Sequence, residues 1–286
     1  MCVTARCLRE AGAVSADAPT ALVTGASSGI GKGFAERFAR NGHNVVLVAR
    51  RVERLRALAE SLERRFGVSA AVVPADLADP AAPGALAAHL REVGLDIGIL
   101  VNCAGFGTAG RFVDEDADRI LEEMTVDVVA PALLTRHLLP SLLAAGPAGA
   151  LITVSSTAGH QPVPNLAVYA ACKAFVTSLT SAIWEESRGS GLRVLALCPG
   201  PTATEFFEAS GSEQFKVGRL GTVEEVVDAA FAALDTTSGP VVTVGLGNRI
   251  QAFAARCAPR RLVLTVGARS TTRAGSGPRE KDGRPC

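Results

Sequence analysis

Residues 21–31 read Ala-Leu-Val-Thr-Gly-Ala-Ser-Ser-Gly-Ile-Gly, an apolar run followed directly by a turn with three glycines. The apolar run predicts a short buried strand over 21–24, and the amphipathic pattern beyond the turn predicts a helix over about 30–41. A glycine-rich turn between a first strand and a helix is typical of dinucleotide-binding α/β folds. This stretch therefore predicts the start of a strand–helix–strand unit.

Each glycine of the turn has its own physical reason. Gly25 permits a tight turn where a side chain would clash. Gly29 lets the backbone approach a pyrophosphate closely, and Gly31 lets the helix pack on the sheet with its positive end toward the phosphates. Ser27 and Ser28 can add hydroxyl donors. A purely structural turn is the alternative, and the position on the first strand favours nucleotide binding over it.

A phosphate-binding loop of the Walker type is excluded, because the glycine spacing fails and Lys32 is followed by Gly33 rather than by Ser or Thr.

Further short apolar runs follow at regular intervals. They predict strands at 44–49, 70–73, 97–101, 151–154, 194–197 and, more weakly, 241–244. Helical patterns of about ten to twenty-five residues separate the runs, and this alternation predicts a parallel sheet covered by helices on both faces. The fold class is therefore α/β, with one doubly wound domain of about seven strands.

The domain boundaries follow from composition. The expected units are a flexible N-terminal extension over 1–19, the nucleotide-binding and catalytic domain over 20–268, and a disordered polar tail over 269–286.

Composition excludes several classes of protein. The chain has 286 residues, 48% of them apolar, and a net charge of +1, so it is expected to be globular and not a general nucleic-acid binder. Its seven cysteines contain no CxxC pair, which favours reduced thiols over a disulfide framework or a metal site. Charges in the first twenty residues argue against a signal peptide, and long uncharged apolar stretches are missing. A cytoplasmic location is expected.

The choice of dinucleotide can be read at the end of the second strand. An acidic residue there would accept hydrogen bonds from a ribose hydroxyl of NAD(H). The chain instead has Arg50 and Arg51, whose guanidinium groups suit the additional phosphate of NADP(H). The alternative is a solvated arginine pair at the head of a helix. NADP(H) is the expected cofactor.

The only tyrosine, Tyr169, stands four residues before Lys173 on a predicted helix, so that the two side chains share a face. A neighbouring ammonium group and the positive charge of an oxidised nicotinamide are expected to lower the phenol pKa toward neutrality. Ser156, after the fifth predicted strand, would hydrogen-bond a substrate oxygen. These three residues predict proton transfer coupled to carbonyl or alcohol redox chemistry.

Over residues 20–265 the chain resembles the short-chain dehydrogenase/reductase family. The resemblance rests on residues 24–31, Asp76-Leu77, Asn102-Cys-Ala-Gly105, Ser155-Ser-Thr-Ala-Gly159, Tyr169 with Lys173, and Pro199-Gly-Pro-Thr202-Ala-Thr204. It implies a Rossmann-type fold, with Asp76 at the adenine, Ala104 and Gly105 along the adenosine part, and Pro199 and Gly200 under the nicotinamide. The run Val-Ala-Arg-Arg and the segment ending at Phe207 resemble a DltE-like bacterial subgroup with NADP as cofactor.

The expected catalytic set is Ser156, Tyr169, Lys173 and Asp127. The expected cofactor-binding set is Gly25, Ser27, Ser28, Gly29, Ile30, Gly31, Arg50, Arg51, Asp76, Leu77, Asn102, Ala104, Gly105, Tyr169, Lys173, Pro199, Gly200, Thr202 and Thr204.

Asp127 is the main departure from the family pattern, which usually has an asparagine at the matching position. That asparagine normally holds a water in a proton relay to the lysine. An aspartate can still accept hydrogen bonds, but it loses two donors and adds a buried negative charge. It is expected to raise the lysine pKa or to slow the relay.

The leading hypothesis is an NADP(H)-dependent oxidoreductase that reduces a ketone or 3-oxo group of a small to medium, partly apolar molecule, or oxidises the alcohol. The alternatives are an NADPH-binding sensor or scaffold with weak or no turnover and a nucleotide-sugar epimerase or dehydratase. The resemblance also implies a homodimer or homotetramer.

The segment 248–268 predicts a helix whose apolar residues stand beside arginines. From Arg249 onward the chain has nine Lys and Arg residues against two acidic ones. Packing on the domain, a substrate lid, a dimer contact and a membrane-surface helix all fit this pattern.

Overall fold

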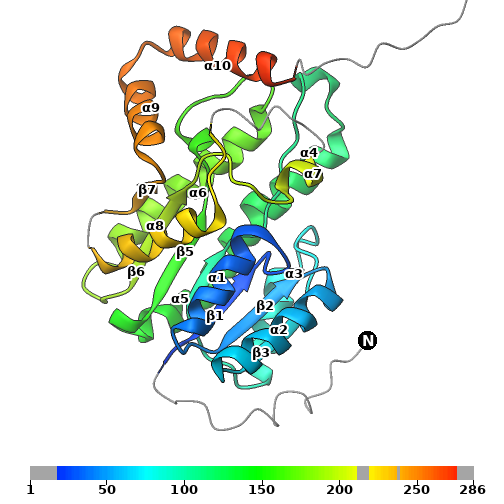
Figure 1. The fold of residues 1–286 in the computed structure, drawn as a ribbon, viewed down its shortest axis with the longest axis vertical. Helices are drawn as coiled ribbons and strands as arrows, with labels where there is room; N and C mark the ends of the chain where they lie inside the picture. The colour runs from blue at the N-terminus through cyan, green and yellow to red at the C-terminus, as the bar shows by residue number, and fades with distance from the viewer. Residues whose placement is uncertain (1–17, 211–218, 237–238, 276–286) are drawn as a thin grey trace, which may run out of the picture.

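The protein is a sheet of seven parallel strands with helices on both of its faces (Figure 1). The computed structural model describes residues 18–210, 219–236 and 239–275. The strands are β1 Thr20–Thr24, β2 Val45–Ala49, β3 Ala70–Pro74, β4 Ile97–Asn102, β5 Ala150–Val154, β6 Arg193–Cys198 and β7 Val241–Thr243. Their order in the sheet is β3-β2-β1-β4-β5-β6-β7, and each pairing is parallel. The predicted doubly wound Rossmann-type fold is confirmed.

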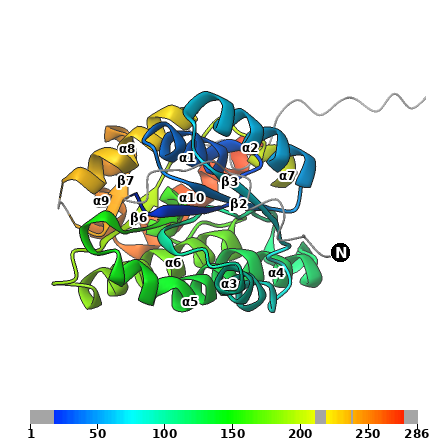
Figure 2. The ribbon, with the colours of Figure 1, turned by 90° about the horizontal axis from the view of Figure 1, so that it is seen from below.

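Helices connect successive strands of the sheet, and two further helices, α9 and α10, follow the last strand. The helices are α1 Gly29–Arg40, α2 Val52–Phe66, α3 Ala82–Glu92, α4 Ala117–Met124, α5 Ala130–Ala144, α6 Ala167–Glu186, α7 Phe206–Ser210, α8 Val223–Asp235, α9 Leu246–Cys257 and α10 Arg260–Gly275. A π-helical turn, Thr125–Val129, joins α4 to α5. Figure 2 shows α1, α2 and α8 on one face of the sheet and α3, α5 and α6 on the other.

Side-chain alternation along the strands produces two cores. In β1, Ala21 and Val23 pack against the layer that contains Phe34, whereas Leu22 packs against the layer that contains Leu134. Successive side chains of a strand point to opposite faces, and strands buried on both faces are therefore apolar at every position. This is the reason that the inner strands β1, β2, β4, β5 and β6 could be recognised as mostly apolar runs.

The chain leaves β1 and β4 in opposite directions, which opens a crevice at their carboxyl ends. Thr24 ties the two strand ends together there. Its hydroxyl oxygen accepts hydrogen bonds from the backbone N–H groups of Cys103 and Ala104, at 2.9 and 3.0 Å. The glycine turn and the loop after β4 are thus fixed side by side at the point where α/β proteins bind their ligands.

The C-terminal region is helical beyond the predicted end of the domain. Helix α10 runs to Gly275, past the boundary expected at 268, and the rest of the predicted tail lies outside the described residues. In Figure 1, α9 and α10 occupy the upper end of the molecule, away from the two helical layers.

Two helical stretches of the described chain, Ala117–Ala144 and Ala167–Glu186, are long and apolar enough by length and composition to cross a membrane. Leu134 and Leu138 from the first and Ile183 from the second are buried in the core beneath the sheet. Their apolar character is therefore explained by packing in this fold.

Candidate active site

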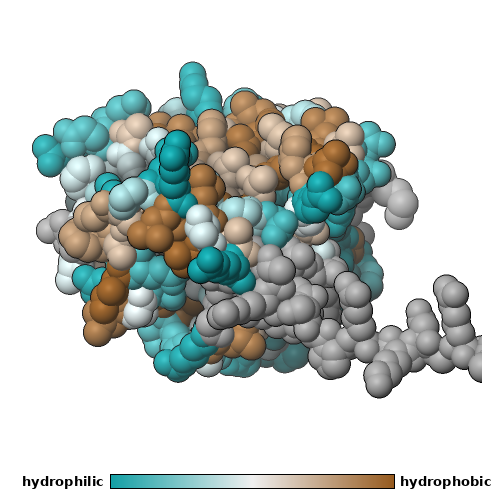
Figure 3. All heavy atoms as spheres, turned by 90° about the horizontal axis from the view of Figure 1, so that it is seen from above, coloured by the Kyte–Doolittle hydropathy of each residue, from teal (hydrophilic) through white to brown (hydrophobic). Residues whose placement is uncertain are grey.

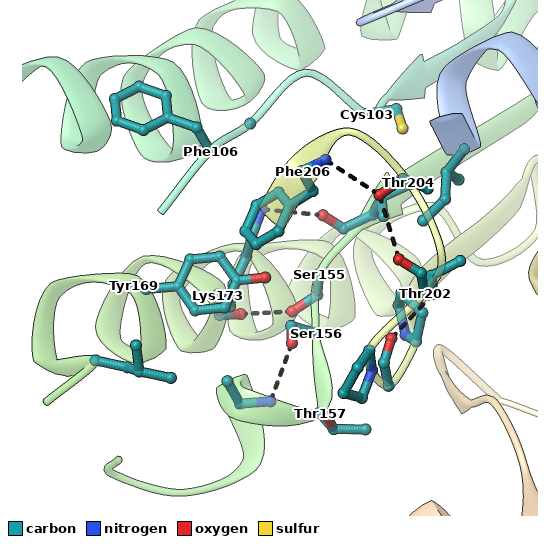
Figure 4. Close-up of a pocket in the computed structure, with 18 of the residues that line it drawn as sticks. Cys103, Phe106, Ser155, Ser156, Thr157, Tyr169, Lys173, Thr202, Thr204 and Phe206 are labelled. Atoms are coloured by element: carbon teal, nitrogen blue, oxygen red, sulfur yellow. Dashed lines mark hydrogen bonds between the residues drawn. The ribbon is translucent and has the colours of Figure 1, made fainter. Parts of the chain in front are cut away.

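Tyr169 and Lys173 lie one turn apart on α6, and both side chains are buried. The Lys173 ammonium nitrogen stands 5.5 Å from the centroid of the Tyr169 ring. Both residues line a cavity of about 810 Å³ at the carboxyl end of the sheet (Figure 4). The spacing predicted from sequence therefore brings the phenol and the amine together in one cleft.

The two serines after β5 have different tasks. Ser155 is structural, because its hydroxyl donates to the backbone carbonyl of Lys173 at 2.8 Å and contacts the Thr177 hydroxyl at 2.7 Å. Ser156 lines the cavity, accepts a hydrogen bond from the backbone N–H of Ala158 and is hydrogen-bonded to Tyr169. The Ser156 hydroxyl therefore lies at the cavity, and its contact with a substrate oxygen stays a prediction.

Asp127 forms a buried ion pair with Lys173. One carboxylate oxygen lies 2.8 Å from the ammonium nitrogen, and the other accepts a hydrogen bond from the backbone N–H of Phe106 at 3.1 Å. Asp127 sits inside the π-helical turn, whose wider winding re-aims side chains relative to a regular α-helix. The close approach also requires Gly105, since a Cβ atom there would stand 2.9 Å from the carboxylate.

The pKa values of these groups follow from burial and charge. Burial acts to lower the pKa of Lys173, but the charge and hydrogen bond of Asp127, together with Tyr169 and Cys103, outweigh it, and the pKa lies above the ordinary lysine value. This agrees with the predicted effect of the aspartate. Burial raises the pKa of the Asp127 carboxyl, and Lys173 only partly reverses that shift.

Burial also raises the pKa of Tyr169. Lys173 and the hydrogen bond with Ser156 lower it, as the sequence predicts for the lysine, whereas Asp127 and Glu123 raise it. The net direction is upward, opposite to the shift expected for a phenol poised near neutrality. The reason is that withdrawal from water disfavours the phenolate more than a single nearby cation stabilises it.

The glycine turn forms the other half of the cavity. Gly25 has a φ of +68°, which favours glycine, and a Cβ at Gly31 would stand only 2.4 Å from the carbonyl oxygen of Gly25. Ser28 is the N-cap of α1, yet its hydroxyl does not cap the helix and instead accepts from Arg51 at 2.7 Å. The amino end of α1 and its backbone N–H groups are thereby left facing the cavity.

Arg51 forms hydrogen bonds with the serine hydroxyl groups of the glycine turn. Its guanidinium donates to Ser27 at 2.9 and 3.1 Å, and to Glu205 at 2.6 Å. Arg54 also binds Glu205, at 2.7 Å. Sequence reasoning did not find Glu205, because this contact joins residues more than 150 positions apart and no local pattern signals it. Arg50 lies 4.0 Å from the carboxylate of Asp76 and is largely exposed.

Most of the predicted site is assembled in one place. The residues of the predicted sets that line the cavity are Gly25, Ser27, Ser28, Gly29, Ile30, Gly31, Arg50, Arg51, Asp76, Leu77, Ala104, Gly105, Ser156, Tyr169, Lys173, Pro199, Gly200, Thr202 and Thr204. Asn102 and Asp127 line a small neighbouring pocket instead.

Asn102 therefore differs from the role expected for it. The residue is buried at the end of β4, and its side-chain amide donates to the Thr135 hydroxyl at 3.0 Å. In this structure the amide holds β4 to α5, and the cavity beside it is lined by the following residues, Cys103 to Phe106.

The substrate end of the cavity has apolar walls. Phe106, Phe206 and Phe207 line it, and the ring of Phe206 lies 5.7 Å from that of Tyr169. His160 is also there, with a ring nitrogen 2.9 Å from the Thr243 hydroxyl. Burial lowers the pKa of His160, which favours a neutral ring. The described residues contain no group of three or more His, Cys, Asp or Glu side chains that could hold a metal ion.

A second acidic residue, Glu123, is fully buried one helical turn before Asp127. Its carboxylate accepts from both the backbone N–H and the hydroxyl of Thr108, at 2.9 and 2.6 Å. The same hydroxyl lies 2.6 Å from Glu115. The pair Asp127 and Glu123 thus fixes the loop after β4 through the N–H groups of Phe106 and Thr108. Nothing local in the sequence distinguishes Glu123 from the exposed acids around it.

Burial raises the pKa of Glu123 from 4.5 to about 7. Since the folded pKa is above the unfolded one, the stability that proton binding contributes is present below pH 4.5 and is lost as the pH rises to about 7. Glu123→Gln is expected to remove this dependence, so the variant gains about 3 kcal/mol relative to wild type between these limits. Urea unfolding at a series of pH values measures it. Glu53→Gln, at an exposed site, is the control, and its free energy of unfolding should vary with pH as that of wild type does. If the free energy of unfolding of Glu123→Gln also varies with pH as in wild type, Glu123 does not have the raised pKa.

Comparisons with known proteins agree with this geometry. Residues 19–214 match the family model described as short chain dehydrogenase. The chain is 34% identical to the 7beta-hydroxysteroid dehydrogenase of Collinsella aerofaciens over 232 residues, which covers 80% of this chain and 86% of that one.

Solved structures are similar over most of the fold. A short-chain dehydrogenase from Sphingobium yanoikuyae in complex with NADPH is 37% identical, with a TM-score of 0.74 over 84% of this chain and 93% of that one. L-Sorbose reductase from Gluconobacter frateurii, complexed with NADPH and L-sorbose, is 28% identical, with a TM-score of 0.71 over 82% and 97%. On the family match and these likenesses, the chain belongs to the short chain dehydrogenase family of oxidoreductases.

Proposed function

We propose that the protein is an NADP(H)-dependent oxidoreductase that reduces a ketone or 3-oxo group of a small to medium, partly apolar molecule, or oxidises the corresponding alcohol. The observation that carries the proposal is the meeting of Tyr169, Lys173 and Ser156 in the cavity that also holds the glycine turn and Arg51. A proton donor and a nucleotide cradle in one cleft are what carbonyl reduction by hydride transfer requires.

The residues present fit NADP(H). The amino end of α1 and the backbone of the glycine turn suit a pyrophosphate. Arg51, with the hydroxyls of Ser27 and Ser28 already in its reach, suits the extra phosphate on the adenosine ribose. The relatives whose structures contain NADPH support the same choice. When bound, the nicotinamide supplies or accepts the hydride.

The proton chemistry belongs to the chain. In reduction the Tyr169 hydroxyl would donate its proton to the substrate oxygen, and Ser156 would hold that oxygen by a hydrogen bond. Lys173 would stabilise the phenolate left behind, because its raised pKa keeps the ammonium charged. Asp127 would position that amine through the ion pair.

The cavity supports a partly apolar substrate. Phe106, Phe206 and Phe207 supply aromatic surface, and Leu262 and Val266 from α10 add aliphatic surface. The relative named as a hydroxysteroid dehydrogenase and the one named as a sorbose reductase support alcohol and carbonyl chemistry without deciding between such substrates.

The test is a comparison of NADPH and NADH binding in wild type and Arg51→Ala, followed by a screen of carbonyl compounds monitored at the nicotinamide absorbance. Loss of charged hydrogen bonds should weaken NADPH binding about 10- to 100-fold and leave NADH binding almost unchanged. Arg56→Ala, at an exposed position on α2, the helix that Arg51 directly precedes, is the matched control. Equal weakening of both dinucleotides would reject the role of Arg51, and absence of NADPH oxidation with every carbonyl would reject the reaction.

A second candidate is an NADPH-binding sensor or scaffold with weak or no turnover. The 2.8 Å pair between Lys173 and Asp127 favours it, because the amine is held by a full negative charge and Asp127 raises the phenol pKa. Asp127→Asn is expected to lower the Tyr169 pKa and move the acidic limb of the pH profile for alcohol oxidation to lower pH. An inactive wild type with activity gained in Asp127→Asn would select this second candidate.

Two finer assignments complete the proposal. We propose a homodimer or homotetramer, which the exposed apolar residues Leu121, Met124 and Phe175 on α4 and α6 support. Membership of the DltE-like subgroup and a cytoplasmic location stay predictions from the sequence.

A further inference from the structure

Helix α9 has its large apolar side chains on the outside. Leu246, Ile250 and Phe253 stand at positions i, i+4 and i+7, on one face of the helix, and are 71%, 61% and 71% exposed. We call these three residues the α9 stripe. An outward stripe of this kind reverses the usual pattern, in which the large apolar residues of a surface helix face the core.

The opposite face of α9 forms a wall of the active-site cavity. Asn248, Gln251, Ala252 and Ala255 line the cavity and lie across the helix from the α9 stripe. The face of α9 that points to the cavity therefore carries small and polar side chains, and the face that points to solvent carries large apolar ones. Packing on the body of the domain, one of the readings of this segment from sequence, does not account for the stripe.

Helix α10 continues the apolar surface to the cavity. Leu262 and Val266 line the cavity and are nevertheless each 53% exposed, so they stand at its rim. Figure 3, which looks down on this end of the molecule, shows apolar side chains interspersed with hydrophilic ones that project outward. The α9 stripe and the rim together make one amphipathic end of the molecule.

The charge of this region has a single sign. Between residues 236 and 278 the chain has no Asp or Glu, whereas Arg249, Arg256, Arg260 and Arg261 lie on or between the two helices. On α9, Arg249 and Arg256 stand seven residues apart and therefore flank the α9 stripe along one side. Arginines beside an exposed apolar stripe match a surface that is negatively charged outside and apolar beneath.

We propose that the α9 stripe, with the adjoining arginines and the α10 rim, binds the surface of an anionic lipid bilayer. The arginines contact lipid headgroups, and Leu246, Ile250 and Phe253 enter the boundary between headgroups and acyl chains. A second copy of the chain is a less suitable partner for this surface, because two identical faces would place positively charged arginines against one another. The lipid contact does not depend on the proposed reaction, although it would place an apolar cavity rim at the membrane.

Sedimentation of the full-length protein with vesicles tests the proposal. One set contains phosphatidylcholine alone, and the other contains an equimolar mixture with phosphatidylglycerol. Wild type is expected to bind the mixed vesicles at least about tenfold more strongly than the neutral ones and to be released by salt. Ile250→Glu/Phe253→Glu should lose this binding, whereas Leu133→Glu, an exposed apolar site on α5, should retain it.

Thermal melting and NADPH binding, measured for all variants without vesicles, separate loss of the surface from loss of the fold. No binding of wild type to anionic vesicles would overturn the proposal, and so would unchanged binding of the double variant. Light scattering without lipid tests whether a second copy of the chain binds this face instead. If wild type is an oligomer and only the double variant dissociates, the face is a contact between copies and the proposal is overturned. Because vesicle binding needs neither cofactor nor substrate, these outcomes are independent of whether turnover is found.

Discussion

Tyr169→Phe is expected to bind NADPH as wild type does and to lose about 10²- to 10⁴-fold in turnover. The substitution removes the only phenolic hydroxyl in the chain and keeps the ring that packs on Phe206. Fluorescence titration with NADPH and steady-state rates with the best carbonyl substrate measure the two effects separately. A turnover rate near that of wild type would reject Tyr169 as the acid.

The single tyrosine also makes its titration directly observable. Phenolate absorbance in this chain reports Tyr169 alone, since no other tyrosine contributes. Burial raises the pKa of Tyr169 in the protein without cofactor, so the midpoint of phenolate formation should lie at higher pH than that of a free tyrosine. Addition of oxidised NADP should lower that pKa, because it brings a positive charge to the cleft. No decrease on addition would show that the cofactor does not activate the phenol.

Lys173→Met is expected to abolish most activity and to destabilise the protein by about 3–5 kcal/mol. The substitution leaves the fully buried carboxylate of Asp127 without its cation, and such an uncompensated charge is costly. Chemical unfolding measures the change in stability, and the same samples give the rates.

The double variant Lys173→Met/Asp127→Asn separates stability from catalysis. Removal of the charge at both positions should restore most of the lost stability, while activity stays low because the ammonium group is absent. If the single and double variants unfold at the same denaturant concentration, the ion pair does not carry the expected energy. If the double variant regains turnover, Lys173 is not needed for the chemistry.

The fold was predictable because its signal is local and repeated. Each of the seven strands is a short, mostly apolar run, and each observed strand agrees with its predicted range to within one residue at either end. A strand buried on both faces lacks the polar alternation of a half-buried strand, so here the short length of each apolar run and the helical patterns between the runs distinguish strand from helix. The end of α10 was not predictable in the same way, because its polar residues from Ser270 suggest disorder by composition alone.

The candidate site was predictable where a local sequence pattern fixes the position of each residue. Spacing puts Tyr169 and Lys173 on one helix face, and Ser156 directly follows a strand at the ligand-binding edge of the sheet, so each could be placed from its local pattern. Contacts between distant segments left no such pattern. Glu205 reaches Arg51 and Arg54 across the cleft, and Asn102 turns away from the cleft toward Thr135. Those outcomes depend on tertiary packing.

The alanines of α9 have a consequence for how this protein could acquire new substrates. Ala252, Ala254 and Ala255 line the cavity on a helix that no strand of the sheet needs for its core. Larger side chains there would reshape the cleft at little expense to folding, whereas the turn at Gly25 and Gly31 tolerates no such change. Substitutions on α9 can therefore alter which substrates the cavity admits while the glycine turn stays unchanged. Substrate specificity is thus the property that can diverge most freely in evolution.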